Sequence, residues 1–233
     1  MDFKKRWLGR ELIDDPECDE TLLIKTVDHF EWINRMVGRY RSILSRFVLA
    51  DMMRDKRRLY HFVDLGAGGC DIAVWLLEQA KRKGLHLHVT AIDANRRLVE
   101  HARAKYHDVI GLDIHHADVG NLRKYGPADY VFMNHVLHHL PDAFIPQLLA
   151  QVRKHCKRRW IISDLLRSKW SYAAFHAVGY FARTSFAFED GRRSIRRAFT
   201  TSDLKDYLGQ AGLTDTARIL QVFPGRLVMV GER

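Results

Sequence analysis

The stretch Val63-Asp64-Leu65-Gly66-Ala67-Gly68-Gly69-Cys70-Asp71 decides the fold of this chain. A short apolar run leads into an acid and a glycine turn, and apolar residues at helical spacing follow from Ile72 to Leu77. This order predicts a strand, a tight loop and a helix, an arrangement that holds nucleotide-like ligands. Glycines let the backbone turn sharply and approach a ligand, and the loop aims N–H groups and a helix N-terminus at it.

Two common glycine-loop sites do not fit the residues that complete this loop. The dinucleotide fingerprint needs a glycine at its sixth position, where this chain has Asp71. The phosphate-binding P-loop ends in Gly-Lys-Ser/Thr, whereas Cys70 and Asp71 follow Gly69 here. The pattern that fits is an acid two residues before Gly-x-Gly at the end of a strand, as found at positions 64–68.

Further landmarks follow in order along the chain. An apolar segment over 87–92 ends at Asp93, and a helical pattern runs from Asn95 to about Lys105. A carboxylate such as Asp93 is a natural bidentate acceptor for a diol. Asp118 follows the segment Ile114-His115-His116-Ala117, and a fourth predicted strand, from about 129 to 133, leads into Asn134.

With these landmarks the chain resembles the class I S-adenosylmethionine-dependent methyltransferases over about residues 60–165. The run Val136-Leu137-His138-His139-Leu140-Pro141-Asp142 is similar to one common in the ubiquinone/menaquinone branch of that superfamily. The resemblance implies S-adenosylmethionine as cofactor and S-adenosylhomocysteine as product, with Asp93 on the ribose hydroxyls and Asp118 on the adenine amine. The expected cofactor-binding residues are Asp64, Gly66, Ala67, Gly68, Asp93, Ala94, Asp118, Val119, Asn134 and His135.

The resemblance also implies an α/β, Rossmann-like methyltransferase fold, with a seven-stranded, mostly parallel sheet whose last strand is antiparallel. Residues 1–58 are expected to form a helical N-terminal extension, and 59–233 the cofactor-binding domain with a helical insertion at 166–199. In the extension, Gly38 separates two apolar helical faces. In the family such an extension often packs over the cofactor and closes the substrate pocket, and here it could equally serve only to cover the sheet.

After a fifth predicted strand at 160–163, the insertion brings several aromatic residues, a predicted turn at Asp190-Gly191 and a basic run from Arg192 to Arg197. The aromatic residues suit either a substrate-pocket wall or a helix pair that buries its own side chains. The basic run suits an anionic substrate group, an acyl-carrier phosphopantetheine or, more commonly, a solvated face. A helix capped by Thr200 or Thr201 and stopped by Gly212 follows, and then strands at 221–223 and 227–230.

Composition narrows the class of protein. The 233 residues carry a net charge of +10, but the basic residues lie in separate patches, which favours solvated faces over a nucleic-acid site. Position 134 also lacks the Asn/Asp-Pro-Pro-Tyr/Phe motif of amine-methylating nucleic-acid enzymes. Three scattered cysteines suit neither a disulfide framework nor a zinc site, so a reducing, cytoplasmic location is expected. We expect neither a secretory signal nor a membrane span.

Methyl transfer from a sulfonium is an in-line displacement in which the protein mainly supplies proximity and orientation. A hydroxyl acceptor must also lose its proton, which calls for a base with a pKa near neutral. His135 is the first candidate, followed by His176 and Asp164, whereas the His138-His139 pair is interpreted as mainly structural. No metal is expected, because Leu165 stands where a second oxygen ligand after strand five would be needed.

The predicted function is methylation of a small molecule, most simply O-methylation of an aromatic or polyketide-like compound. One alternative is a C-methyltransferase of quinone biosynthesis, although the Pro-Gly-Gly usual before strand five in that branch is replaced by 155–160 here. Another is a catalytically inactive methyltransferase fold that serves as a binding or regulatory protein. The sequence leaves open a monomer or a homodimer and does not identify the acceptor.

Overall fold

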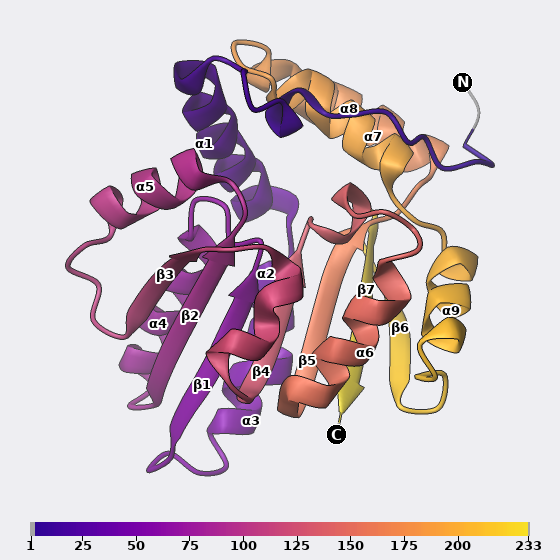
Figure 1. Ribbon diagram of the computed structural model, residues 1–233. Coiled ribbons are helices and arrows are strands. Elements are labelled where there is room, and N and C mark those ends of the chain that lie inside the picture. The colour runs from indigo at the N-terminus through magenta and orange to yellow at the C-terminus, as the bar shows by residue number, and fades with distance from the viewer. Residues whose placement is uncertain (1–2, 233) are drawn as a thin grey trace.

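A seven-stranded sheet forms the centre of the protein, in the order β3-β2-β1-β4-β5-β7-β6 (Figure 1). The computed structural model describes residues 3–232, apart from the side chains at 178, 179 and 182. The expected domain bounds 1–58 and 59–233 include residues 1, 2 and 233, and these three positions lie outside the described residues. The strands are β1 (Leu59–Leu65), β2 (His86–Asp93), β3 (Leu112–His116), β4 (Ala128–Asn134), β5 (Cys156–Leu165), β6 (Ala217–Val222) and β7 (Arg226–Glu232).

The predicted sheet topology is confirmed. β1 to β5 pair in parallel, and β7 pairs antiparallel with both β5 and β6. The strand order reverses at β1, which has β2 on one side and β4 on the other. Loops leave the two neighbouring strands in opposite directions at such a point, and the crevice that opens between them is where α/β sheets bind ligands.

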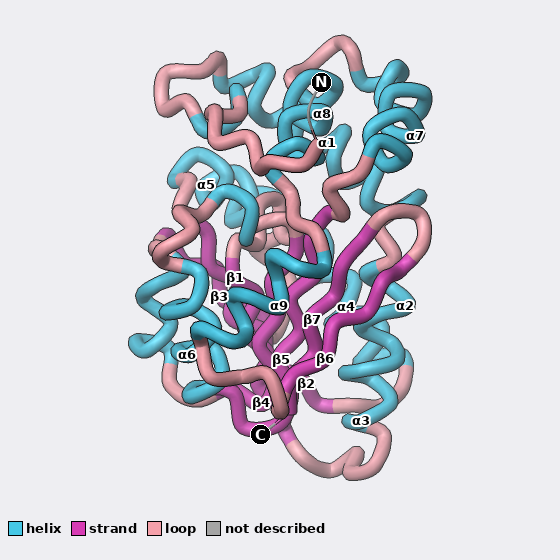
Figure 2. The backbone as a smooth tube through the Cα atoms, turned by 90° about the vertical axis from the view of Figure 1, so that its right-hand side faces the viewer, coloured by secondary structure: helices cyan, strands magenta, loops and turns pink. Residues whose placement is uncertain are grey.

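Helices cover both faces of the sheet (Figure 2). Residues alternate between the two faces along each strand, so that Tyr60 and Phe62 of β1 enter one apolar core, while Val63 and Leu65 enter the other. The first core is closed by α2 (Tyr40–Leu44), the π-helical η2 (Ser45–Leu49), α3 (Ala50–Met52) and α4 (Asp71–Arg82). The second is closed by the 3-10 helix η3 (Val119–Tyr125), α6 (Ile145–His155) and α9 (Thr201–Gln210). Helix α5 (Arg96–Lys105) follows β2.

A third group of helices gathers beyond the carboxyl ends of the parallel strands (Figures 1 and 2). It consists of α1 (Glu20–Val37), α7 (Lys169–Gly179), the short η5 (Tyr180–Ala182) and α8 (Ala187–Arg197). We call α1, α7 and α8 the cap. Of the extension before β1, α1 joins the cap, while α2, η2 and α3 cover the sheet.

The predicted turn at Asp190-Gly191 is wrong, because both residues lie inside α8. The Asp190 carboxylate accepts the backbone N–H groups of Leu12 and Ile13, at 2.7 and 2.9 Å. Gly191 is needed for close helix packing, since a Cβ at this position would lie 2.0 Å from Cζ of Phe175 on α7. The residue types Asp and Gly locally favour a turn. Here the contacts of α8 with Leu12 and Ile13 on one side and with Phe175 on the other stabilise a helix instead.

Gly191→Ala is expected to lower the free energy of unfolding by about 1–3 kcal/mol, because the added methyl group must displace the Phe175 ring. Chemical denaturation measures this loss. Gly209→Ala, in the open part of α9, is the matched control, since its nearest neighbour would be 3.9 Å away. Equal stability of the two variants would contradict this account of the α7–α8 contact.

One smaller expectation also needs correction. The strand predicted at 221–223 begins earlier and runs as β6 over Ala217–Val222. It is an edge strand that pairs with β7 and is half-exposed, so its apolar pattern is weak. The second apolar face predicted for the extension is confirmed, because the consecutive helical segments α2, η2 and α3 all bury their apolar residues.

Candidate functional site

A cavity of about 820 Å³ lies between the carboxyl ends of the parallel strands and the cap. Ligand pockets are commonly about 300–1,000 Å³, so this cavity is large enough for more than one small molecule. The ten residues expected to bind the cofactor, which come from four separate segments of the sequence, all line it. The sequence motifs and the tertiary structure thus indicate the same place.

The glycine loop after β1 forms one wall of the cavity. Gly66 and Gly68 have φ angles of +73° and +51°, which only glycine adopts without strain. A Cβ on Gly66 would lie 2.2 Å from Val136. The N–H groups of Gly66 and Ala67 donate to the carbonyl of Ile92, at 2.7 and 3.0 Å, and so tie this loop to β2.

Asp93, the last residue of β2, is held rigidly beside the glycine loop. Its Oδ2 accepts the N–H of Gly68 at 2.7 Å, and its Oδ1 accepts the N–H of Asn95 at 2.8 Å. Burial raises the pKa of this carboxyl, although the two N–H groups oppose the rise. Each oxygen has a further lone pair, so the carboxylate can accept two additional hydrogen bonds from a diol in the cavity.

Asp64, in β1, presents a carboxyl group that is 3% exposed and lines the same cavity. Burial, and then the charges of Asp71 and Asp93, raise the pKa of Asp64 to about 8. Among the described residues it forms no ion pair. A buried acid without a cation next to it is suited to the positive group of a ligand.

Asp118 and Asn134 mark the ends of two further strands. Asp118 follows β3 and caps η3, where its Oδ1 accepts the N–H of Gly120 at 2.7 Å. Asn134 ends β4, and its Oδ1 accepts a hydrogen bond from Nη1 of Arg226 at 3.2 Å. Both residues line the cavity, on opposite sides of the glycine loop in the strand order.

His135 is the catalytic candidate that the structure places in the cavity wall. It has a φ of 60° and precedes the 3-10 helix η4 (Leu137–His139), so it does not share a helical face with His138 and His139. Its Nε2 is buried and, among the described residues, has no hydrogen-bond partner. Burial, and then the charge of Arg226, lower its pKa well below the ordinary value, so the imidazole is neutral.

The other two catalytic candidates lie elsewhere. His176 is exposed on α7, with its ring 5.3 Å from that of Phe188, and it is not part of the cavity wall. Asp164 is buried beneath His138, whose Nδ1 lies 2.7 Å from Asp164 Oδ1. Burial opposes the charge on both groups, but their pairing raises the pKa of His138 to about 9 and holds that of Asp164 well below its usual range.

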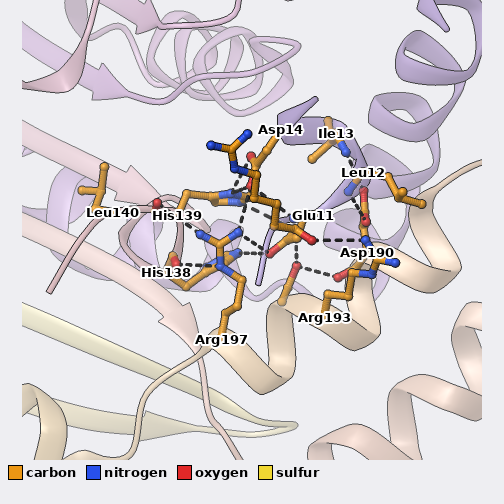
Figure 3. Close-up of polar contacts among 12 residues, drawn as sticks. Glu11, Leu12, Ile13, Asp14, His138, His139, Leu140, Asp190, Arg193 and Arg197 are labelled. Atoms are coloured by element: carbon orange, nitrogen blue, oxygen red, sulfur yellow. Dashed lines mark hydrogen bonds and ion pairs between the residues drawn. The ribbon is translucent and has the colours of Figure 1, made fainter. Parts of the chain in front are cut away.

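Residues 3–15, which we call the N-terminal strap, run along α7 and α8 of the cap (Figure 1), and the strap residues Glu11 to Asp14 contact η4 and α8 (Figure 3). Nε2 of His138 lies 3.5 Å from Oε1 of Glu11, which is buried. Asp14 forms an ion pair with Arg197 of α8, whose Nη1 lies 2.8 Å from Oδ2 of Asp14. Arg197 also donates to the carbonyls of His138 and His139. The end of the basic run is therefore buried in this contact rather than solvated.

The rest of the basic run also has protein partners. Arg192 and Arg193 form ion pairs with Glu189, and Arg196 lies over the ring of Trp7. None of the arginines of this run is in the cavity wall, which holds only smaller residues of α8. Arg192 and Arg193 thus form ion pairs within α8, while Arg196 contacts the strap.

Glu11, His138 and His139 are the group of described residues whose spacing would suit a metal ion, with ligand atoms within 4.8 Å of one another. Arg197 already places its guanidinium beside this group, 3.8 Å from Oε1 of Glu11. A nearby fixed cation opposes binding of a second one. We therefore assign the group a structural role, as the contact between the strap and η4.

Sequence reasoning missed Glu11 and Arg226 in the cavity wall. Glu11 has no local pattern around it, and its position depends on the path of the strap. Arg226 carried one signal, since it is a charged residue immediately before the apolar run 227–230 and immediately after Pro224-Gly225.

Within the described residues, no helix is both long and apolar enough to span a bilayer.

Comparison with known proteins agrees with this geometry. Residues 62–159 match the family described as methyltransferase domain. No curated protein matches the chain by sequence. Magnesium protoporphyrin IX methyltransferase from Synechocystis PCC 6803 with bound SAH is 15% identical, with a TM-score of 0.55, over 95% of this chain and 90% of that chain.

Two other solved structures show the same fold. The plantazolicin methyltransferase BpumL in complex with SAH is 12% identical, with a TM-score of 0.64, over 95% of this chain and 92% of that one. Human N-acetylserotonin methyltransferase in complex with SAM is 16% identical, with a TM-score of 0.63, over 92% of this chain and 56% of that one. Residues 62–159 thus match a methyltransferase-domain family, and the chain has the Rossmann-like fold of these solved methyltransferases.

Proposed function

We propose that this protein transfers the methyl group of S-adenosylmethionine to an oxygen atom of a small, mainly apolar acceptor, aromatic or polyketide-like. One observation carries the proposal. A single cavity joins the cradle formed by Asp93 and the glycine loop to an apolar wall that holds the neutral His135, whose Nε2 has no hydrogen-bond partner among the described residues. Donor and acceptor can therefore occupy one space beneath the cap.

The donor side of the cavity matches the charges of S-adenosylmethionine. Asp93 would accept hydrogen bonds from the two ribose hydroxyls, and Asp118 would accept one from the adenine amine. Asp64 would face the positively charged part of the cofactor. Solved structures of this fold with bound SAM or SAH give this assignment further support.

The acceptor side is formed mainly by the cap. Val27, Phe30 and Ile33 of α1, Phe175 of α7 and Ile195 of α8 line the cavity. Such apolar walls hold flat or hydrophobic molecules through contact area, while a few polar groups fix their orientation. Of the aromatic residues in the insertion, Phe175 contributes to this wall, so the insertion serves both the cavity and its own packing.

In the reaction, the acceptor oxygen attacks the methyl carbon in line with its bond to sulfur. The new O–CH₃ bond forms as the C–S bond breaks, and its electron pair stays on sulfur, giving S-adenosylhomocysteine. In this proposal the proton of a hydroxyl acceptor passes to Nε2 of His135, which has no hydrogen-bond partner among the described residues. Because burial and Arg226 lower the pKa of this imidazole, it suits an acidic hydroxyl, such as that of a phenol, that releases its proton as the O–CH₃ bond forms. Residues of the cavity otherwise act by holding the two reactants in line and excluding water.

His135→Ala is expected to lower the turnover number by roughly 10²-fold, the usual contribution of a positioned base. Binding of S-adenosylmethionine should change little, because other residues hold its charged groups. Initial-rate measurements and calorimetry separate the two effects. His107→Ala, on the exposed loop after α5, is the control of the same residue type. Full activity of the His135 variant would mean that the acceptor reaches the enzyme already ionised or uses another base.

Calorimetric titration with S-adenosylmethionine, with NAD as the control, tests the donor directly. Micromolar binding of the first and none of the second is the expected result, followed by methylation of at least one phenol in a panel of acceptors. No binding of S-adenosylmethionine would reject the proposal. Binding without transfer to any acceptor would favour a binding or regulatory role instead.

The cellular setting is part of the same proposal. Cys18, Cys70 and Cys156 are free, and the last two are buried. Free thiols suit a reducing compartment such as the cytoplasm, where small-molecule methylation uses the soluble cofactor pool. A monomer and a homodimer are both compatible with this function, since the described cavity is built from one chain.

A further inference from the structure

Arg226 is a buried cation in the cavity wall that the proposed methyl transfer does not use. It is the first residue of β7 and is 3% exposed. Its hydrogen bonds reach neutral oxygens, with Nη1 at 3.2 Å from Asn134 Oδ1 and Nη2 at 3.1 Å from Asn34 Oδ1. A longer contact of 3.4 Å joins Nη1 to the hydroxyl of Ser163.

No carboxylate among residues 3–232 forms an ion pair with Arg226. The negative charge that attracts it most directly, that of Asp164, is already hydrogen bonded to His138 at 2.7 Å. Burial lowers the pKa of Arg226 to about 10, so the guanidinium keeps its charge at neutral pH. A buried charge without a counter-ion is destabilising, and proteins normally pair such a group.

The strand order places Arg226 on the acceptor side. The cavity wall runs from Asp93 at the end of β2, across β1, β4 and β5, to Arg226 at the start of β7. Neighbouring strands lie about 4.8 Å apart, so the four steps from β2 to β7 span roughly 19 Å. The donor cradle lies at the β1–β2 end, and Asn134 lies between that cradle and Arg226.

We propose that Arg226 binds a carboxylate of the acceptor, so that the natural substrate is an organic acid with an apolar body. This inference rests on the proposed function and names its substrate class. The planar guanidinium presents paired N–H donors that match the two oxygens of a carboxylate. The incoming carboxylate would take the place of one of the two asparagine oxygens, and would supply the missing negative charge.

The charge around Arg226 favours a single carboxylate over a more highly charged group. Its neighbour His135 is neutral, and the arginines of the basic run in α8 are outside the cavity wall. A phosphate-bearing acceptor would require more positive charge than this end of the cavity offers. The apolar side chains of α1 and α7 on the same side suit the remainder of an aromatic acid.

The test compares aromatic carboxylates with their own neutral amides as ligands of the protein saturated with S-adenosylhomocysteine. The pairs are benzoate and benzamide, 2-naphthoate and 2-naphthamide, and 4-hydroxybenzoate and 4-hydroxybenzamide. Calorimetry is expected to show at least a tenfold preference for the carboxylate in one or more pairs. In Arg226→Gln this preference should fall to about one, with the affinity for S-adenosylhomocysteine changed by less than about twofold.

Arg226→Lys keeps the positive charge but loses the planar pair of N–H donors. It should therefore show an intermediate preference for carboxylates over amides. This variant also decides the question if the Gln variant does not fold. Arg192→Gln, outside the cavity wall, is the matched control and should keep the full preference. The absence of any carboxylate preference in the unmodified protein, or its survival in Arg226→Gln, would overturn the assignment.

Failure of the proposed function gives a different result. If S-adenosylhomocysteine does not bind, the same ligand pairs are titrated into the empty protein. A preference for carboxylates that Arg226→Gln removes would then still support the anion site, while the methyl transfer is rejected. Binding of S-adenosylhomocysteine without any carboxylate preference would reject the anion site and leave the methyl transfer in place.

Discussion

Asp93→Ala is expected to reduce the affinity for S-adenosylmethionine by roughly 10²-fold or more while the protein stays folded. The reason is that the carboxylate would accept two hydrogen bonds from the ribose, each assisted by its charge. The same oxygens also hold the N–H groups of Gly68 and Asn95, so the variant loosens the glycine loop as well. Calorimetry measures the affinity, and circular dichroism checks the fold.

Two further variants separate direct binding from loop geometry. Asp93→Asn keeps one oxygen acceptor and should bind with intermediate affinity. Asp113→Ala, on the exposed side of β3, is the matched control and should bind as the unmodified protein does. Unchanged affinity in Asp93→Ala would mean that the cofactor lies elsewhere, and the assignment of the donor cradle would be abandoned.

Asp64→Asn is expected to have two opposite effects, stabilising the empty protein and weakening cofactor binding. The carboxyl is 3% exposed, and burial together with Asp71 and Asp93 raises its pKa to about 8. The empty folded protein therefore disfavours the charged form, and asparagine removes that penalty. The same substitution removes the negative charge that would face the cationic part of S-adenosylmethionine, so the affinity falls.

The pH dependence follows from the direction of the shift. Because the pKa of an ordinary aspartate is 3.8 and that of Asp64 in the folded protein is about 8, the folded state binds more protons than the unfolded state between these values. Stability from this group is thus present at low pH and is lost as the pH rises toward 8. Asp71, whose pKa burial raises to about 6, acts in the same direction.

Denaturation at several pH values measures this effect. The gain from Asp64→Asn should be on the order of 5 kcal/mol near pH 8 and should vanish near pH 4. In the unmodified protein, binding of S-adenosylmethionine near pH 7 should release a proton, visible as a heat that depends on the buffer. Asp108→Asn, which is exposed, should show neither effect. A loss of stability in the Asp64 variant would contradict the unpaired, buried state of this carboxyl.

The fold was predictable because its signals are local. The acid and glycines at 64–68, the acid at 93 and Asn134 each follow an apolar segment, and Asp118 follows the segment 114–117. In a parallel sheet the carboxyl ends of all strands meet at one edge, so local patterns along the sequence become one site. The structure indeed brings all these residues into a single cavity wall.

The expectations that failed depend on contacts between distant segments. Asp190-Gly191 has the chemistry of a turn, yet the strap and Phe175 hold it within α8. The basic run has the pattern of a solvated face, yet Arg197 is buried against η4 and Asp14. Each of these positions is decided by a partner more than ten residues away, which a local pattern does not contain.

The sequence by itself determined the sheet, the glycine loop and the part of the cavity wall that we propose as the donor side, because backbone geometry and short-range patterning fix them. Only the tertiary structure decided the acceptor side. It separated His135 in the cavity from His176 outside it, paired Asp164 with His138, and brought Asn34, Asn134 and Arg226 together from three elements. The physical reason is that the burial and charge of a side chain depend on every segment packed around it, and these are set by the path of the whole chain.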